Sequence, residues 1–283
     1  MSEKWPLGVF ASIDAGLGVD LQVAHELGVT TVHLHTPHRQ SRTPERIAEF
    51  RALLDRLGIR VTCVFAGFEG ESYASIPATA DTVGLVPREF RQERIAELRE
   101  IIDFAHKLGV DAVGLHLGFV PHDAADPDYA ELIEVTRQMC DLCAANGQRL
   151  HLETGQEPAD VLDQFLTAVD RPNIRINFDP ANMILYGVAE PLPALKQLGK
   201  WVGSVHCKDA TWSQEPGVTW GTETALGQGA VDFDAFLGVL EEIGYSGPLT
   251  IEREIPQEPE RQREEIGGAL GLLQKLKAAR GLG

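Results

Sequence analysis

The chain has 283 residues with 25 Lys and Arg against 42 Asp and Glu, so its formal net charge is −17 at pH 7. Proteins that bind nucleic acid non-specifically gain their affinity from clustered basic residues, so this balance argues against that class and against a membrane-surface role. Hydrophobic residues make up 43% and charged residues 24%, which is typical of a soluble globular chain and excludes general disorder.

The N-terminal sequence and the cysteine content indicate the expected compartment. Residues 1–6 lack the features of a signal peptide, and no run approaches the roughly 18 apolar residues that span a bilayer. The four cysteines are too few for a disulfide scaffold and are typical of small buried side chains; they are Cys63, Cys140, Cys143 and Cys207. We therefore expect a cytoplasmic protein.

Short β-branched runs alternate with helical patterns along the whole chain, which is typical of βα units and a parallel sheet. Eight strands are expected to begin near Leu7, Thr31, Arg60, Ala112, Arg149, Ile174, Val202 and Pro248. Helices are expected over residues 20–27, 44–57, 88–108, 128–146, 158–169, 192–198, 232–243 and 258–279. Helix stop signals are present at Gly28, Gly58, Gly109, Gly147, Gly199 and Gly244.

Eight βα units in a chain near the usual ~250 residues favour a closed (β/α)₈ TIM barrel, with an open doubly wound sheet as the alternative. The sequence has neither a Gly-x-Gly-x-x-Gly after the first strand nor a P-loop, which are the common reasons for an open sheet. No linker divides the chain, so residues 1–283 are expected to form one domain. The longest loops, Gly67–Pro87 and Asp209–Gly229, follow the third and seventh strands and belong to the active face of such a barrel.

Polar residues of one parity recur on the last four strands, where branched apolar side chains normally fill a barrel. They are His151 and Glu153, then Arg175, Asn177 and Asp179, then Ser204, His206 and Lys208, and finally Thr250, Glu252 and Glu254. Burying an unpaired charge costs roughly several kcal/mol, whereas a divalent cation would satisfy a carboxylate cluster. Carboxylates from three strands with one imidazole suit Mn²⁺, Mg²⁺, Co²⁺ or Zn²⁺, with Mn²⁺ mildly favoured.

Each of these residues also has a purely structural interpretation. Asp179 precedes a proline and could cap a turn. His206 could be a satisfied core histidine, and Glu252 could form an internal ion pair with Lys208 or Arg175. Four such residues on consecutive strand ends nevertheless favour a joint site.

The sequence around these residues resembles the xylose-isomerase-like barrel superfamily. The resemblance lies in Leu-His-Leu-Glu153, Asn-Phe-Asp179-Pro-Ala-Asn182-Met, Val-His206-Cys-Lys208-Asp209, Leu-Gly-Gln-Gly229-Ala-Val-Asp-Phe and Thr-Ile-Glu252. It covers nearly the whole chain and implies a metal site with the ligands Glu153, Asp179, His206 and Glu252. In epimerase-like members the two glutamates also accept and donate a proton, which implies catalytic roles for Glu153 and Glu252. Barrels of this superfamily often form dimers or tetramers, so we expect a homo-oligomer.

The superfamily contains sugar isomerases and epimerases, inosose dehydratases and endonuclease IV-type repair enzymes. The leading hypothesis is a sugar isomerase or epimerase, in which a metal-bound enediolate forms after a carboxylate removes the proton beside a carbonyl. The alternative is a lyase on the same site that dehydrates an inosose or eliminates the substituent of a 3-keto-glycoside. A third hypothesis is a silent sugar-binding barrel.

Two departures from the family motifs bear on this choice. Ketose 3-epimerases carry a histidine where this chain has Asn182, and the arginine expected soon after His206 is missing from Thr211-Trp212-Ser213. Both departures weigh against ketose epimerisation, and Asn182 motivates the lyase alternative. The endonuclease branch requires additional histidines that this chain lacks, in agreement with its negative charge.

Further residues are expected to line a substrate chamber. The favoured contacts are His35, His116, Asn182, Lys208 and Trp212, while His33 lies deeper. Lys208 could instead form an ion pair with Asp179 or Glu254, and Trp212 could be an ordinary loop anchor.

The sequence offers little for binding a phosphate group. Gly227 and Gly229 are a weak signal for an anion site, because their N–H groups would precede the helix expected from residue 232. Lys and Arg are scarce nearby, which favours an unphosphorylated sugar or polyol as the partner.

Overall fold

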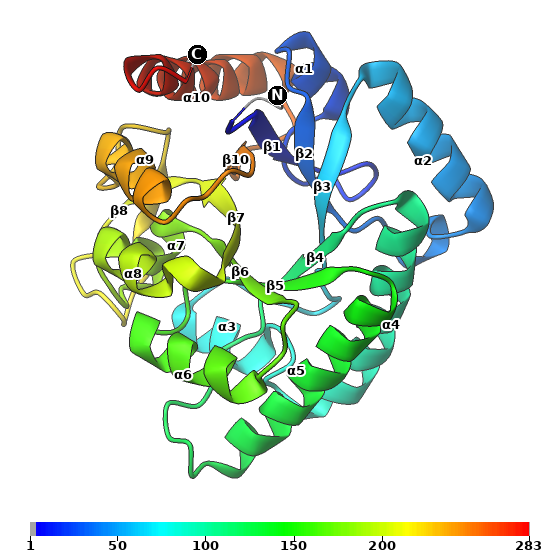
Figure 1. Ribbon diagram of the computed structural model, residues 1–283, viewed down its shortest axis with the longest axis vertical. Helices are drawn as coiled ribbons and strands as arrows, with labels where there is room; N and C mark the ends of the chain where they lie inside the picture. The colour runs from blue at the N-terminus through cyan, green and yellow to red at the C-terminus, as the bar shows by residue number, and fades with distance from the viewer. Residues whose placement is uncertain (1–3, 283) are drawn as a thin grey trace.

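The computed structural model describes residues 4–282, and its main sheet is a closed barrel of parallel strands (Figure 1). The strand order β1-β10-β7-β6-β5-β4-β3-β2 returns to its start, so this sheet has no free edge. The strands are β1 (Leu7–Ala11), β2 (Thr31–His35), β3 (Arg60–Phe65), β4 (Ala112–Leu115), β5 (Arg149–Glu153), β6 (Ile174–Phe178), β7 (Val202–Cys207) and β10 (Leu249–Ile251). The predicted single-domain TIM barrel is confirmed, and the open sheet is wrong.

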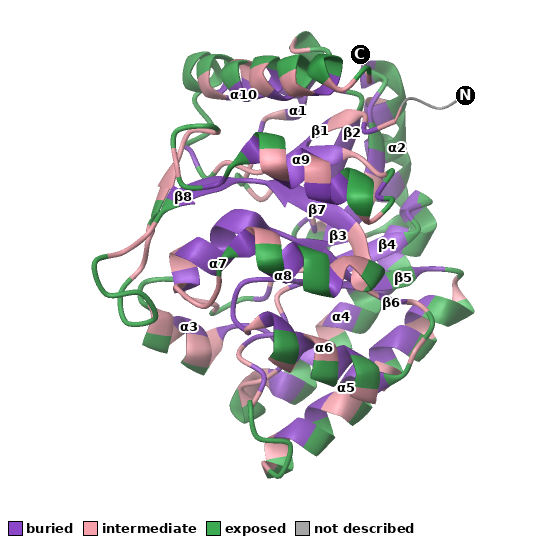
Figure 2. Ribbon diagram, turned by 60° about the vertical axis from the view of Figure 1, so that its left-hand side comes forward, coloured by how far each residue is buried: buried purple, intermediate pink, exposed green. Residues whose placement is uncertain are grey.

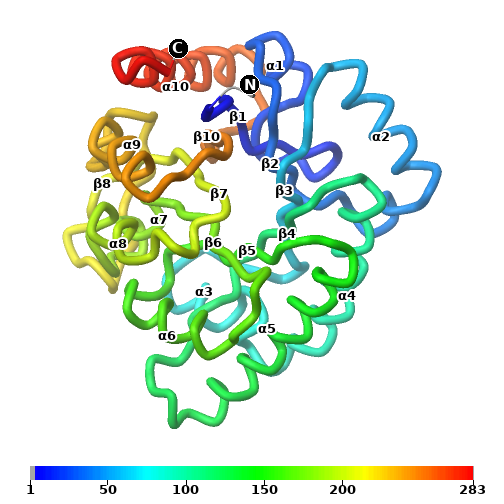
Figure 3. Tube along the Cα trace, in the orientation of Figure 1, coloured from blue at the N-terminus to red at the C-terminus, as the bar shows by residue number. Residues whose placement is uncertain are grey.

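Helices surround the barrel and connect successive strands (Figures 1 and 3). They are α1 (Leu21–Glu26), α2 (Pro44–Leu57), α3 (Ile76–Thr82), α4 (Arg88–Leu108), α5 (Pro127–Ala145), α6 (Ala159–Val169), α7 (Pro180–Tyr186), α8 (Pro191–Leu198), α9 (Phe233–Glu242) and α10 (Pro259–Ala279), with 3₁₀ turns at Arg39–Ser41 and Gly199–Trp201. Every helix predicted from the sequence is present, with ends that differ by no more than one residue. The amphipathic period and the caps are local signals, which explains this agreement.

Three short elements lie in segments that the sequence left without assignment. The loop after β3 contains α3, and the loop after β7 contains an antiparallel hairpin of β8 (Asp209–Thr211) and β9 (Thr222–Thr224). The third, α7, begins directly after β6 with Asp179 as N-cap and a proline in its first turn, and it ends at Gly187 with φ 69°. An Asp-Pro start followed by a glycine stop is a helix signature that the sequence contained.

The stop predicted at Gly199 differs from the observed backbone. Gly199 has a right-handed φ of −50° and continues α8 into a 3₁₀ turn. A Cβ at this position would lie 2.6 Å from Cγ2 of Ile243, at the end of α9. The glycine is therefore required for close packing rather than for a left-handed cap.

Burial follows the layered architecture, because the helices turn apolar stripes toward the sheet and polar faces outward (Figure 2). In α6, for example, the buried side chains recur at three- and four-residue spacing as Leu162, Phe165, Leu166 and Val169. The four cysteines are free and buried, as predicted. None of the helices within residues 4–282 combines the length and apolarity needed to cross a bilayer.

The two ends of the chain meet where the barrel closes. Strand β1 pairs with β10, and α10 lies beside them (Figure 3). Lys277 Nζ donates to the carbonyl of Trp5 over 2.8 Å, and Trp5 Nε1 donates to the carbonyl of Tyr245 over 2.8 Å. The first of these buried hydrogen bonds joins the last helix to the segment before β1, and the second joins that segment to the loop before β10.

Candidate metal centre

The four predicted ligands meet at the C-terminal ends of four neighbouring strands. Glu153 ends β5, Asp179 follows β6, His206 lies in β7 and Glu252 follows β10. One donor atom from each side chain lies within 4.8 Å of the others. Since the barrel order β10-β7-β6-β5 places these strands side by side, residues 99 positions apart in the sequence share one small volume.

The imidazole of His206 lies between the carboxylates. Its Nδ1 is 3.1 Å from Oε1 of Glu153, 3.1 Å from Oε2 of Glu252 and 3.9 Å from Oδ2 of Asp179. Burial opposes the charged form, but the carboxylates of Glu153 and Glu252 raise the pKa of His206 well above its ordinary value. A proton on Nδ1 and a divalent cation would therefore compete for the same place.

The two carboxylate oxygens of Asp179 have different environments. Oδ1 caps α7 by accepting hydrogen bonds from the N–H groups of Ala181 at 2.8 Å and Asn182 at 3.0 Å. Oδ2 is buried and has no hydrogen-bond partner. Burial raises the pKa of Asp179 well above its ordinary value. The predicted cap is thus confirmed for one oxygen, and the orphaned second oxygen fits a cation ligand, which would satisfy it.

A chain of hydrogen bonds inside the barrel orients Glu153. His151 Nδ1 lies 2.8 Å from Oγ of Ser204, which donates to Oδ1 of Asn177 over 2.6 Å. Asn177 Nδ2 in turn donates to Oε2 of Glu153 over 2.7 Å. Burial lowers the pKa of His151 to about 3, so this histidine is neutral near pH 7. The inward polar residues predicted on β5, β6 and β7 therefore support one carboxylate of the cluster.

Lys208 supports the carboxylate of Glu252. Its Nζ lies 3.4 Å from Oε2 of Glu252 and 2.6 Å from Oε1 of Glu254. Burial opposes ionisation, but Lys208 and His206 hold the pKa of Glu252 well below its ordinary value. The ion pair between Lys208 and Glu254 is confirmed, whereas Arg175 as a partner of Glu252 is wrong, because its guanidinium donates to two backbone carbonyls at the other end of β6.

The anion site suggested by the glycines after β9 is already filled by the chain's own Asp209. Its Oδ2 accepts from the N–H groups of Gly227 at 2.9 Å and Gly229 at 2.8 Å. Oδ1 of Asp209 accepts hydrogen bonds from the N–H groups of Ala210 at 2.9 Å and Val231 at 3.1 Å. A Cβ at Gly229 would lie 2.2 Å from Oδ1 of Asp209, so the turn fits closely around this carboxylate. The weak signal for an anion site therefore corresponds to an internal carboxylate, and these N–H groups are not available to a phosphate group.

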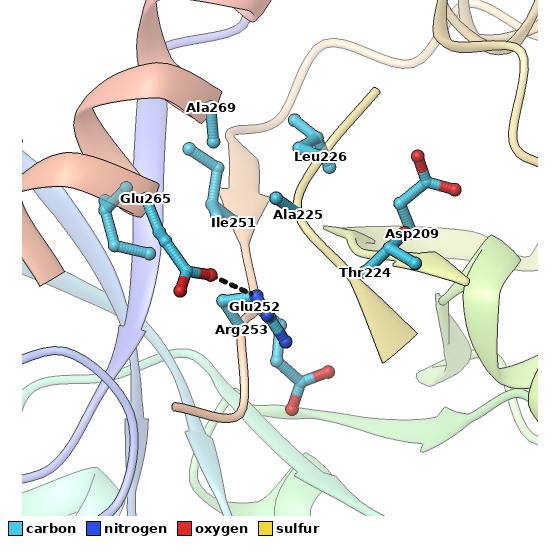
Figure 4. Close-up of a pocket in the computed structure, with 10 residues that line it drawn as sticks. Asp209, Thr224, Ala225, Leu226, Ile251, Glu252, Arg253, Glu265 and Ala269 are labelled. Atoms are coloured by element: carbon cyan, nitrogen blue, oxygen red, sulfur yellow. Dashed lines mark hydrogen bonds and ion pairs between the residues drawn. The ribbon is translucent and has the colours of Figure 1, made fainter. Parts of the chain in front are cut away.

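The chain next to Glu252 ties β10 to its surroundings. Arg253 Nε donates to Glu265 of α10 over 2.8 Å, the interaction drawn in Figure 4, and its Nη1 lies 2.9 Å from Glu223 of β9. The small cavity in that view lies between β10 and α10 and is lined by apolar side chains such as Leu226 and Ala269 together with charged ones such as Glu252 and Glu265. Arg253 thus connects the strand that carries Glu252 to the hairpin above the site.

Two predicted substrate contacts, His35 and His116, lie near the cluster without joining it. The ring of Phe10 lies 5.7 Å from that of His206 and 6.3 Å from that of His35, so one aromatic ring separates His35 from the ligand. His116 Nδ1 lies 3.1 Å from Nε2 of Gln156. Neither histidine contacts a ligand carboxylate among the hydrogen bonds of residues 4–282.

The other predicted contacts divide between the site and the core. Asn182 Nδ2 lies 3.5 Å from Oε1 of Glu153, beside the ligands. Trp212 is a partly buried side chain packed against the main hydrophobic core. The sequence did not single out Tyr186, whose hydroxyl lies 3.0 Å from Gln156 Nε2 and whose ring lies 4.5 Å from that of Trp220. It was missed because its helix, α7, was not predicted.

Comparisons with known proteins agree with the barrel fold. A family model described as xylose isomerase-like TIM barrel matches residues 21–275. The crystal structure of a xylose isomerase domain protein from Planctomyces limnophilus is 55% identical to this chain, with a TM-score of 0.94 over 97% of this chain and 98% of that one.

More distant relatives include named enzymes. An inosose dehydratase from Klebsiella pneumoniae is 25% identical over an alignment of 194 residues that covers 58% of this chain and 64% of that protein. An inosose dehydratase from Clostridium beijerinckii matches over only 38% of its length. A D-psicose 3-epimerase structure from Clostridium cellulolyticum H10 is 17% identical with a TM-score of 0.71, over 96% of this chain and 99% of that one. At that identity the likeness shows the fold alone.

Proposed function

This chain belongs to the xylose isomerase-like TIM barrel family, and from that premise we propose that it is a metal-dependent isomerase or epimerase of a keto-sugar. The reaction is proton transfer at a carbon beside the carbonyl. The observation that carries the proposal is the convergence of two glutamates on Nδ1 of His206, beside the orphaned Oδ2 of Asp179. Three carboxylates at such short range require a positive partner.

The donor set fits a divalent cation held by Glu153, Asp179, His206 and Glu252. When bound, such a cation acts as a Lewis acid that makes the C–H beside a coordinated carbonyl acidic. Oxygen and imidazole donors without a thiolate suit Mn²⁺, which we favour, and also Mg²⁺, Co²⁺ and Zn²⁺.

The two glutamates are prepared for proton transfer by different partners. The ammonium group of Lys208 favours the ionised form of Glu252, which suits a carboxylate that removes a proton. Glu153 is held in place by the amide of Asn177. In the proposed reaction one carboxylate takes the proton from the substrate carbon, and the other returns a proton to that carbon or to its neighbour.

A second candidate function is a lyase on the same site. Curated inosose dehydratases are among the relatives, and Asn182 lies beside Glu153 where ketose 3-epimerases carry a histidine. Removal of the same proton from a substrate with a β-leaving group would end in elimination. The product therefore separates the two candidates.

The test is proton NMR in D₂O on a panel of ketoses, inososes and 3-keto-glucosides, with Mn²⁺ supplied before incubation and both Mn²⁺ and protein removed before the spectra. Metal-dependent deuterium uptake beside the carbonyl, abolished by a chelator, supports the proton transfer. A stereoisomer or aldose product supports the isomerase, whereas loss of water or aglycone supports the lyase. Binding without any uptake would instead support a silent sugar-binding barrel.

A further inference from the structure

Charged groups around the metal centre leave little place for an anionic substrate. Among residues 4–282, Lys208 is the one lysine that forms an ion pair with a carboxylate of the predicted ligands. Its side chain is only 3% exposed. Its ammonium group is shared between Glu252 and Glu254, with the shorter distance, 2.6 Å, to Glu254. A substrate phosphate or carboxylate would have to displace Glu254 to reach it.

Glu254 is held in this position by the hairpin after β7. Oε1 of Glu223, in β9, accepts a hydrogen bond from the backbone N–H of Glu254 over 3.0 Å. The same oxygen lies 2.9 Å from Nη1 of Arg253, which also pairs with Glu265. The side chain of Glu254 is 71% exposed, so it stands at the solvent side of Lys208.

The net charge of the site also disfavours an anionic substrate. A divalent cation and Lys208 would together balance the three carboxylate ligands, with His206 neutral as a ligand. Glu254 then adds one uncompensated negative charge beside the place where substrate binds, and repels a second anion.

Two other candidates for binding an anion are already engaged. Arg42, whose charge acts on His35, pairs with Glu97 at 2.8 Å. The N–H groups of Gly227 and Gly229, which could bind an anion, donate to Asp209.

We propose that Glu254 is a specificity-determining residue that restricts this site to uncharged substrates, namely neutral keto-sugars or cyclitols, by occupying the ammonium group of Lys208. This inference rests on the proposed function in one respect, since it takes the metal cluster as the place where substrate binds. It goes further by assigning the charge of the substrate and the residue that selects it.

The test is calorimetric titration of the Mg²⁺-loaded protein with inorganic phosphate, a probe that needs no knowledge of the sugar. The wild-type protein is expected to show no saturable binding. Glu254→Gln is expected to strengthen phosphate binding by about tenfold or more, because it removes one charge and frees Lys208. Glu215→Gln, in the exposed part of the loop between β8 and β9, makes the same change of charge without touching Lys208 and is expected to leave phosphate binding unchanged.

A double variant assigns the effect to Lys208. In Glu254→Gln with Lys208→Met the gain is expected to disappear, while circular dichroism reports whether each variant folds. Saturable phosphate binding by the wild type, no gain in a folded Glu254→Gln protein, or an equal gain in Glu215→Gln would overturn the proposal.

A second arm compares D-fructose with D-fructose 6-phosphate in the same titration. Tighter binding of the phosphate ester by the wild type would also overturn the proposal. If no keto-sugar exchanges deuterium but Glu254→Gln alone gains phosphate affinity, the proposed reaction fails while the charge selection stands.

Discussion

His33 Nδ1 lies 3.0 Å from Nε2 of His206, deep inside the barrel. Burial lowers the pKa of His33 well below its ordinary value, so this imidazole is neutral and its Nδ1 can accept a hydrogen bond from the Nε2–H of His206. The contact keeps the proton of the neutral His206 ligand on Nε2 and leaves Nδ1 facing the carboxylates. A partner of this kind fixes the tautomer and the ring orientation of a metal-binding histidine.

Replacing His33 with leucine is expected to weaken metal binding by about 10- to 100-fold, because the His206 ring loses its orienting partner. Competition with a fluorescent chelator measures the affinity. His25→Leu is the control, since it removes a histidine of α1 whose Nδ1 lies 2.8 Å from the carbonyl oxygen of Leu57 and which, among residues 4–282, belongs to no hydrogen-bond chain that leads to a ligand. Equal affinity losses in the two folded variants would contradict the positioning role.

Metal affinity is expected to rise with pH. The pKa of His206 is raised in the protein without metal, so at neutral pH its Nδ1 proton must leave before a cation is bound. The pKa of Asp179 is also raised, so its protonation opposes metal binding further as the pH is lowered. Calorimetry in buffers of different ionisation enthalpy should show net proton release on binding, and affinity should fall as the pH is lowered. Binding without proton release would show that the cation binds elsewhere.

Glu153→Gln and Glu252→Gln are each expected to reduce metal-dependent deuterium exchange by about 10²- to 10⁴-fold, because an amide cannot take up the substrate proton. Circular dichroism and metal affinity, measured alongside, separate loss of chemistry from loss of fold or metal. Glu215→Gln should exchange at the wild-type rate. Near-normal exchange in either glutamate variant would remove that residue from the catalytic assignment.

Asp209→Asn is expected to lower the free energy of unfolding by about 2–4 kcal/mol, because the carboxylate accepts four backbone hydrogen bonds that a neutral amide cannot all replace. Urea denaturation measures this change. Asp232→Asn provides the comparison, since Asp232 caps α9 through one N–H and asparagine caps about as well. Similar small losses in both variants would contradict the special role of Asp209.

The buried Glu157 is expected to make stability depend on pH. Burial raises its pKa from 4.5 to about 8, while its Oε1 accepts a hydrogen bond from the N–H of Val120 over 2.8 Å. The folded state therefore holds a proton that the unfolded state releases, so this contribution to stability is complete below pH 4.5 and is lost as the pH rises toward 8.

Glu157→Gln should remove that dependence, because glutamine mimics the protonated acid. The variant is expected to match the wild type near pH 4.5 and to be more stable by about 2–5 kcal/mol at pH 8, since each pKa unit corresponds to about 1.4 kcal/mol. Chemical denaturation across this range tests the prediction. A constant difference at all pH values would show that Glu157 does not titrate in this range.

The sequence by itself determined the barrel, because its strands and helices are specified by local periods, whereas the candidate metal ligands were suggested by polar residues of one parity and by the family resemblance. Alternating β-branched runs and amphipathic helices specify βα units wherever they occur. The candidate ligands stood out because polar side chains of one parity, such as Glu153 and His206, occupy positions that branched apolar side chains normally fill in a barrel. The short helix α7 was not predicted, only because its Asp-Pro start was interpreted as a turn.

Only the tertiary structure decided which polar groups become partners, since this depends on distances between strands that are far apart in the chain. His33 and His206 are separated by 173 positions, yet share a hydrogen bond across the barrel. Lys208 had several carboxylates within the reach of its flexible side chain, and the hairpin after β7 places Glu254 next to it. Likewise the sequence showed two glycines whose N–H groups could bind an anion. Only the folded structure shows that these N–H groups donate to the carboxylate of Asp209.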